Sequence, residues 1–378
     1  MTPLLFDPLD APTDAWPDGL DVERLYIKEV ARRGPAALIA NVQTRWLALR
    51  SGGRIFPVTV NDGETGDSYV CLPHTAYVLY GRAELDLVDV GAWAPLFRTL
   101  ITLAGRGLLA AGLNRIVNLD NWLLSTNLHG DWAGEDLGDI RTALQRRFPD
   151  HIIALRSLDG WSSPALLDAA RRDGWILVPS RQIWVNDDLA RGWRRRNSTC
   201  QDFRLLRGSG LTVEDPADLN DADADRIAEL YHLLYVGKYS ALNPVFTPAY
   251  IAMTHRLGIL RYRVARAPSG IIMAVAGALL RNGVLTPPIV GYDTTRPREE
   301  GLYRIASCLF GGMAADNGAR LHGSAGAGHF KRMRGARGEI EYWAMHVGHL
   351  PPARRVAVAA LRIILDRLVV PMMKGRGL

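Results

Sequence analysis

Hydrophobic and polar positions follow their most regular pattern between residues 260 and 292. Leu260, Tyr262 and Val264 alternate with Arg261, Arg263 and Ala265, as in a half-buried strand, and 271–280 is continuously apolar, as in a central strand. Asn282-Gly283 then predicts a tight hairpin turn, and 284–292 reads as a third strand whose hydrogen-bond ladder Pro287-Pro288 must interrupt. The pattern therefore predicts an antiparallel meander of three strands.

A long helix is predicted directly after this meander. It opens at Gly301, carries apolar residues at helical spacing up to Ala314, and ends at Asn317-Gly318. A strand over 320–324, a helix over 328–333 and a strand over 340–347 follow. Because the long helix comes after a strand and the polar loop 293–300, its free N-terminal amides are suited to bind an anion.

In the first half of the chain, segments with the periodicity of helices alternate with segments with the periodicity of strands. This pattern predicts helices over 21–33, 93–111, 136–147 and 164–173, and strands over 46–49, 55–60, 68–72, 115–119, 151–156 and 176–185. This alternation favours an α/β (α+β) fold, in which helices cover a sheet. At the other end, 353–369 predicts a helix with apolar residues on most of its surface. We expect that helix to be buried or to lie against a partner, and a membrane surface is the alternative.

Length and composition are those of an ordinary two-domain protein. With 378 residues, we expect an N-terminal arm over 1–20, a first lobe over 21–186 and a second lobe over 187–378. Three cysteines argue against a disulfide scaffold, and the acidic, proline-rich start does not have the pattern of a signal peptide. No stretch has the length and low charge of a membrane span. These features predict a cytoplasmic protein without a transmembrane segment.

Several short motifs stand at recognisable places in this order of elements. They are the basic segment Arg194-Arg195-Arg196-Asn197 leading to Leu211-Thr212-Val213, the strand end Gly291-Tyr292-Asp293, the helix start Gly301-Leu302-Tyr303, and Phe330-Lys331 with Gly335-Ala336. Together they resemble the GNAT acyltransferase superfamily, specifically its two-lobed FemABX type, over about residues 187–350. The resemblance implies two fused GNAT-like lobes, each a mixed, mainly antiparallel sheet flanked by helices. The first lobe would be degenerate, and the second would carry an added C-terminal helix.

The resemblance also implies a reaction and a donor site. GNAT enzymes move an acyl group from a thioester, usually of coenzyme A, to an amine, and the donor's pyrophosphate lies at the start of the long helix. Arg298 and Gly301 match the family signature there, and Leu302 follows, with Tyr303 in a position that is usually small. A bulky Tyr303 would hinder close approach of a phosphate. It therefore keeps an acyl or peptidyl carrier protein, or aminoacyl-tRNA, open as the donor beside acyl-CoA or another acyl thioester. No tightly bound cofactor is expected.

Two residues are the catalytic candidates. Lys331 stands four residues before Gly335, where GNAT enzymes have a tyrosine and FemABX-type enzymes resemble this chain in using a lysine. A cation there could stabilise the oxyanion or protonate the leaving group. Asp293 ends a strand and could accept a proton from the attacking amine or orient it. The structural alternatives are a surface lysine and a loop cap.

Other polar and aromatic residues are candidates for substrate contacts. They lie at a strand end, on the last strand, in the loop 238–247 and in a polar loop that follows a strand of the first lobe: Tyr292, Tyr342, Tyr239, Ser240, Asn121, Trp122 and Ser125. Packing or loop-stabilising roles are the alternative for each. We predict no metal site, because each Cys/His pair lacks a second half, and no DNA-binding module, because no helix-turn-helix or zinc pattern is present.

The sequence thus predicts an N-acyltransferase that acts on a small-molecule amine. The alternative is a catalytically inactive GNAT-like protein that binds a carrier protein or RNA through the basic segment 194–207.

Overall fold

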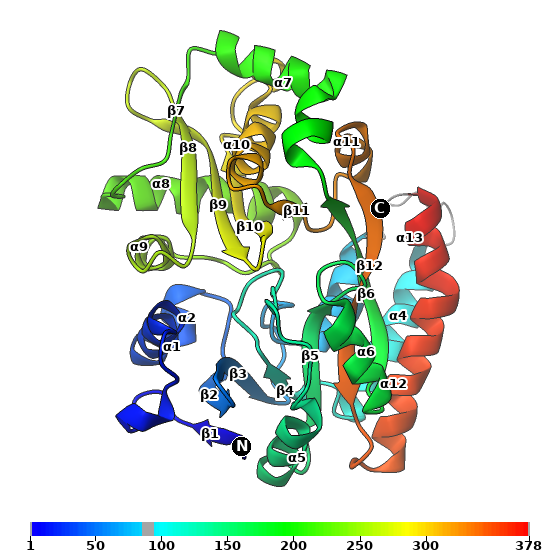
Figure 1. Ribbon diagram of the computed structural model, residues 1–378. Coiled ribbons are helices and arrows are strands. Elements are labelled where there is room, and N and C mark those ends of the chain that lie inside the picture. The colour runs from blue at the N-terminus through cyan, green and yellow to red at the C-terminus, as the bar shows by residue number, and fades with distance from the viewer. Residues whose placement is uncertain (1, 85–93, 377–378) are drawn as a thin grey trace.

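All strands of the computed structural model, which describes residues 2–84 and 94–376, belong to a single mixed sheet (Figure 1). Its order is β1-β2-β3-β4-β5-β12-β6-β11-β10-β9-β8-β7. The bounds of the strands are β1 Leu4–Phe6, β2 Arg45–Ser51, β3 Arg54–Asp62, β4 Arg115–Leu119, β5 Ile152–Leu158, β6 Ile176–Asn186, β7 Thr212–Glu214, β8 Arg261–Arg266, β9 Ile272–Arg281, β10 Val284–Tyr292, β11 Arg320–His322 and β12 Arg337–His346.

The strand order is symmetric about its centre. Counting inward from either edge, three antiparallel pairs are followed by one parallel pair, β4–β5 on one side and β10–β11 on the other. An antiparallel pair comes next on both sides, and β12 and β6 pair antiparallel in the middle. The two halves of the chain therefore build equivalent lobes, in which β1–β5 correspond to β7–β11.

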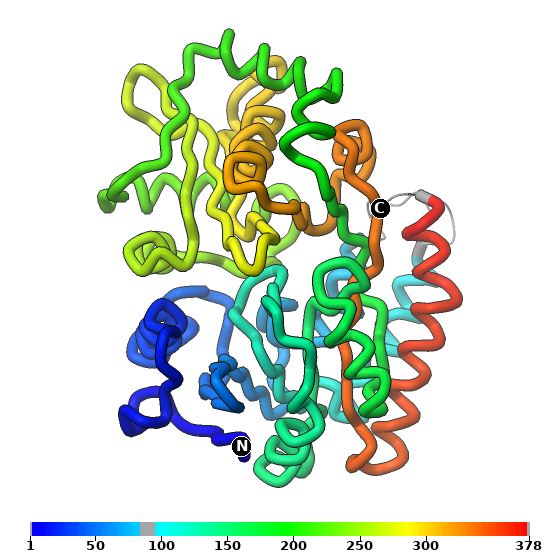
Figure 2. The backbone as a smooth tube through the Cα atoms, in the orientation of Figure 1, coloured from blue at the N-terminus to red at the C-terminus, as the bar shows by residue number. Residues whose placement is uncertain are grey.

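The last strand of each half is exchanged between the lobes. β6 ends the first half of the chain but pairs with β11 of the second, whereas β12 ends the second half and pairs with β5 of the first. Figure 2 follows this crossing as the green and orange segments that run side by side between the lobes. Because β6 and β12 also pair with each other over much of their length, the exchange joins the lobes by continuous backbone hydrogen bonds.

Helices cover the sheet and fill the connections. Their bounds are α1 Asp21–Arg33, α2 Pro35–Leu38, α3 Tyr80–Glu84, α4 Ala94–Ala110, α5 Leu137–Arg147, α6 Pro164–Arg172, α7 Asn197–Gly208, α8 Asp221–Tyr231, α9 Pro248–Arg256, α10 Leu302–Asp316, α11 Gly328–Met333, α12 Pro352–Ile364 and α13 Val370–Arg376. A π-helical segment, Leu365–Val369, joins α12 to α13, and this helical run packs along β6 (Figure 1). No helix within the described ranges has the length and apolar character needed to cross a membrane.

The predicted fold class is confirmed, and most predicted elements form. The Asn282-Gly283 hairpin joins β9 to β10, and the register of that pair shifts between Thr286 and Ile289, around the two prolines. One strand prediction is wrong: residues 68–72 form a turn, in which the amides of Cys71 and Leu72 both donate to the carbonyl of Ser68. The apolar run there is buried by tertiary packing, which periodicity alone cannot distinguish from a short central strand.

Candidate functional site

The two parallel strands of the C-terminal lobe separate soon after they meet. β10 and β11 pair at only two positions, Val284 with Arg320 and Leu285 with Leu321. β10 then continues to Tyr292, whereas β11 ends at His322. Ring contacts link the end of β10 to the start of α10 and to the short helix α11, through Tyr292, Tyr303 and Phe330. We refer to these segments, together with the loop that follows β11, as the C-terminal site.

The start of α10 has the backbone geometry that the sequence predicts but is partly covered. Gly301 adopts φ 63°, a left-handed conformation, and caps the helix ahead of Leu302 and Tyr303. The amides of those two residues stand in the first turn, where the helix itself supplies no acceptor. Leu205 of α7 packs so close to Gly301 that any side chain on residue 301 would collide with it. Arg298 is exposed in the loop before the helix.

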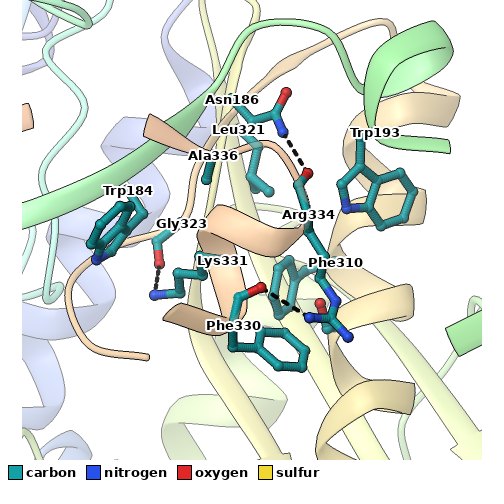
Figure 3. Close-up of a pocket in the computed structure, with 11 residues that line it drawn as sticks. Trp184, Asn186, Trp193, Phe310, Leu321, Gly323, Phe330, Lys331, Arg334 and Ala336 are labelled. Carbon is teal, nitrogen blue, oxygen red and sulfur yellow. Dashed lines mark hydrogen bonds between the residues drawn. The ribbon is translucent and has the colours of Figure 1, made fainter. Parts of the chain in front are cut away.

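Lys331 is enclosed by the backbone of the glycine-rich loop that follows β11. Its Nζ donates to the carbonyl oxygen of Gly323 at 2.6 Å (Figure 3). It also donates to the carbonyl oxygen of Ala325 at 2.8 Å and approaches that of Ser324 at 3.4 Å. Burial, together with the nearby charge of Arg181, lowers the pKa of Lys331 to about 7. Its ammonium can therefore release or take up a proton near neutral pH.

A small cavity lies beside Lys331, between α11 and the exchanged strand β6. It measures about 20 Å³, room for roughly one water molecule. Trp184 and Asn186 of β6 line it together with Phe310 of α10 and Phe330 of α11 (Figure 3). The wall of the C-terminal site is thus partly built from the first half of the chain.

Asp293 is held by two partners at the end of β10. Arg226 of α8 donates to its Oδ2 at 2.7 Å, and both the amide and the hydroxyl of Thr295 donate to its Oδ1. Burial by itself would raise the pKa of Asp293, but the hydrogen bonds from Thr295 and Arg226 outweigh it and hold that pKa below its ordinary value. The carboxylate is therefore ionised and oriented at neutral pH.

Aromatic rings form one wall of the C-terminal site. The Tyr303 ring lies 4.7 Å from Phe330 and 5.8 Å from Tyr292, measured between centroids. Lys238 extends this wall, because its Nζ donates to the Tyr292 hydroxyl at 3.2 Å and lies 5.8 Å from the ring of Tyr239. The structure thus brings three predicted residues of the second lobe together.

Sequence reasoning missed the acid that ties this region together. Asp202 of α7 is buried and accepts from Arg304 of α10 and from Arg334, just after α11, both at 2.6 Å. It holds the long helix and the lysine-bearing segment in one arrangement. The available signal was that Asp202 is the single acid in the basic run 191–208.

The candidates of the first lobe occupy a different environment. Asn121 is fully buried, donates to Thr59 and to the carbonyl of Val70, and accepts from Arg156. The buried Trp122 donates to Asp120. The Ser125 carbonyl accepts from Arg181 at 2.6 Å. These bonds join loop to sheet, so the polar groups of this loop already have protein partners.

The remaining candidates lie at the edge of the site or away from it. Ser240 follows Tyr239, and its hydroxyl accepts from the amide of Leu242, which fixes the loop. Tyr342 lies in the middle of β12, where Asp366 and Arg171 are nearby charges, and it packs on the core of the first lobe. Throughout residues 2–84 and 94–376, no group of three or more His, Cys, Asp or Glu side chains could hold a metal ion.

Comparisons with known proteins give structural matches alone. No protein-family model matches the chain, and no curated protein does. Solved structures that resemble it include L-PGS from Bacillus licheniformis, with 14% identity, a TM-score of 0.42, and coverage of 59% of this chain and 76% of that one. FemX has 11% identity, a TM-score of 0.42 and coverage of 55% and 75%. A tandem GNAT protein from the clavulanic acid biosynthesis pathway has 10% identity, a TM-score of 0.36 and coverage of 88% and 90%.

The symmetric sheet and its two lobes agree with the predicted two-lobed, FemABX-like GNAT type. Because the identities and TM-scores of the matched structures are low, no statement about the activity of this chain rests on them.

Proposed function

We propose that the chain is an N-acyltransferase that moves an acyl or aminoacyl group from a thioester or ester donor to an amine at the C-terminal site. The observation that carries this proposal is the position of Lys331. Its side chain lines the small cavity between α11 and β6, and its pKa of about 7 allows proton transfer at neutral pH.

The geometry around Lys331 leaves it one proton to use. An ammonium has three N–H donors, and two of them make short bonds to Gly323 and Ala325. The contact with the Ser324 carbonyl is long, at 3.4 Å, so the third donor can turn toward a substrate without losing a strong bond.

The proposed reaction proceeds by attack of the amine nitrogen on the donor's carbonyl carbon. The carbonyl π electrons move onto oxygen, and Lys331 stabilises the oxyanion that forms. When the intermediate collapses, the bond between carbon and the leaving sulfur or oxygen breaks, and Lys331 gives that atom its proton. An amine that arrives protonated first loses one proton to solvent, and the attacking neutral amine loses a second proton to solvent once the bond between nitrogen and carbon has formed. Lys331 then takes up a proton from solvent, which completes the balance.

Asp293 is better suited to orient the amine than to deprotonate it. Its lowered pKa makes it a weak base, and a base role would require it to release Arg226 or Thr295. As an ionised carboxylate it attracts a protonated amine to the end of β10. Tyr292, Tyr303 and Tyr239 would then line the path of the acceptor.

The donor is proposed to be acyl-CoA or another acyl thioester, with a carrier-bound acyl group or aminoacyl-tRNA as alternatives. The first-turn amides of α10, with Arg298 nearby, would bind a phosphate of the donor. Leu205 lies against this helix start at Gly301, so a diphosphate reaching that side of the glycine must displace it. This favours a donor held mainly by its acyl end and by contacts outside α10.

The test is a screen by mass spectrometry of acyl-CoA, carrier-bound and aminoacyl-tRNA donors against a set of amines. With an active pair, Lys331→Met should lower kcat by about 10²-fold or more, the range of general acid catalysis. Activity should fall as the pH rises through about 7, because the acid must be protonated. Lys331→Arg should keep part of the activity and move that fall to higher pH.

The matched control is Lys28→Met, since Lys28 lies over Trp16 in the first lobe. A Lys331→Met variant with the turnover and pH profile of the parent protein would show that the site is assigned wrongly.

A binding protein without catalysis is the second candidate, and Leu205 beside Gly301 is the observation that favours it. Arg204 and Arg207 are exposed on the same helix, α7, and would contact a carrier protein or RNA. Salt-sensitive binding of RNA, with no turnover of any donor in the screen, would support this candidate over the enzyme.

A further inference from the structure

Exposed apolar side chains gather on two neighbouring helical elements. Nine of the seventeen large hydrophobic residues that are exposed among the described residues belong to α4 or to the run α12–α13. We call these nine residues the outer helix face: Leu96, Phe97, Leu100, Leu103, Val356, Ile363, Ile364, Leu368 and Met372. α4 and α12 touch each other along one side of the molecule (Figure 1).

The core does not account for these residues. α12 already packs inward through Val358 and Leu361, which are buried against a cluster of residues from β4, β5, β6 and β12. The outer helix face lies elsewhere on the same helix, and Val356 and Leu368 are 66% and 61% exposed. A soluble surface seldom leaves so many large apolar side chains together, so this face calls for an occupant.

The charge around the outer helix face has one predominant sign. Six exposed cations stand on α4 and on the run α12–α13, namely Arg98, Arg106, Arg355, Arg362, Arg367 and Lys374. Asp366 is the only acid in either stretch, and it pairs with Arg362 at 3.6 Å. A partner that binds the outer helix face must therefore combine an apolar region, which these side chains can enter, with negative charge.

We propose that the outer helix face docks on an anionic lipid bilayer. Leu, Ile, Val and Phe side chains would enter the boundary between headgroups and acyl chains, while the arginines and Lys374 contact lipid phosphates, as basic amphipathic helices do. The helices lie on the surface and do not cross the bilayer, because no described helix could span it.

A second copy of the chain fits this face less well. In a two-fold dimer the same patch meets itself, so the cations of one copy would face those of the other. Because Asp366 is the only acid within α4 and the run α12–α13, few pairs between these helices could compensate that repulsion. An anionic bilayer provides the opposite charge over a wide area and does not require a matching shape. The proposal does not depend on the acyltransferase activity.

The experiment measures cosedimentation of the full chain with vesicles of phosphatidylcholine alone, and of phosphatidylcholine mixed with phosphatidylglycerol or with phosphatidylserine. We expect binding to both anionic mixtures and little to phosphatidylcholine. Added salt should weaken it, because surface charges are screened beyond roughly 10 Å at 0.1 M. Equal binding to both anionic lipids separates a charged-surface effect from a site for one headgroup.

Matched variants locate the contact. Ile364→Gln with Leu368→Gln should reduce the bound fraction strongly, and Arg362→Gln or Arg367→Gln should each weaken binding about fivefold. Ile271→Gln is the control, because Ile271 is 52% exposed in a turn between β8 and β9, against 50% for Ile364. Circular dichroism checks that each variant is folded.

Two results would overturn the proposal. One is vesicle binding that Ile364→Gln with Leu368→Gln reduces no more than Ile271→Gln does. The other is the absence of vesicle binding together with a concentration-dependent dimer that the Ile364 and Leu368 substitutions dissociate, which would assign the face to a second copy.

Discussion

The two lobes place a parallel strand pair, a loop and a helix in the same order, but they use the loop differently. In the first lobe β4 and β5 pair at four successive positions, whereas β10 and β11 pair at two. The loop after β4 is buried and filled with its own polar side chains, while the loop after β10 is largely exposed. The same topology thus gives a buried polar loop in one lobe and an exposed one in the other.

The difference comes from side chains and not from strand order. The Asn121 side chain accepts a hydrogen bond from Arg156 and donates to Thr59 and to the Val70 carbonyl. Its hydrogen-bonding groups are therefore already paired within the protein. In the second lobe the hydrogen bonds of Lys331 go to the backbone carbonyls of Gly323, Ser324 and Ala325, and the third of these bonds is long, at 3.4 Å. The polar groups of the first-lobe loop are therefore tied to side chains and backbone of the sheet, whereas Lys331 is held by one short loop.

The largest expected effect on stability belongs to the first lobe. Asn121→Ala should lower the free energy of unfolding by about 2–4 kcal/mol, because it removes buried hydrogen bonds to Arg156 and Thr59 and deprives the buried Val70 carbonyl of its side-chain donor. Asn197→Ala, at the exposed start of α7, is the control and should change stability by less than about 0.5 kcal/mol. Urea denaturation measures both. Equal small losses would mean that the hydrogen bonds of Asn121 do not stabilise the first-lobe loop.

The next effect is a pH dependence that Lys331 gives to stability. Its pKa is about 7 in the folded protein and ordinarily 10.5, so between these values the unfolded chain binds more protons than the folded one. Unfolding free energy should therefore rise with pH in this window, by up to about 1 kcal/mol per pH unit. Lys331→Met should remove that slope in denaturation curves at pH 7 and 9, whereas Lys374→Met should keep it. A slope that persists without Lys331 must come from another group.

A smaller effect is expected at the ion pair that holds Asp293. Arg226→Ala should cost about 1–2 kcal/mol at neutral pH, since the pair is mostly buried. It should also raise the pKa of Asp293. The stability that this carboxylate contributes is present above its unfolded pKa and is lost as the pH falls through its folded pKa. The free energy of unfolding should thus fall less in the variant than in the parent protein as the pH is lowered. If both proteins lose the same stability at acid pH, the pairing of Arg226 with Asp293 is excluded.

The smallest effect is expected at the exposed edge of the C-terminal site. Arg298→Ala should change unfolding free energy by less than about 0.5 kcal/mol, because the side chain is exposed. If the start of α10 holds a donor phosphate, the variant should raise KM for that donor and leave kcat near the parent value. Steady-state kinetics with coenzyme A and pantetheine thioesters of one acyl group separates the two, because pantetheine lacks the diphosphate. An equal KM change for both donors would contradict a phosphate contact.

Much of the fold could be read from local patterns. Periodicity gives α1, α10 and the meander β8–β10, since these depend on which residues of one segment share a face. Asn282-Gly283 and Asn317-Gly318 mark their ends because such pairs tolerate turn conformations that other residues avoid. Lys331, Asp293 and the start of α10 could be named as candidates from the resemblance, but Asp202 and the ionisation of these groups could not.

Features that depend on contacts between distant segments are visible only in the tertiary structure. The exchange of β6 and β12 depends on which remote strand completes each sheet edge, and no local pattern in either strand records its partner. The lowered pKa of Lys331 depends on its burial and on the nearby Arg181. The ionised state of Asp293 depends on Arg226, and Gly301 is covered by Leu205 of another helix. The sequence by itself determined the elements and their order, because these follow from short-range periodicity. The exposed loop in one lobe and the filled, buried loop in the other follow from contacts between residues far apart in the chain.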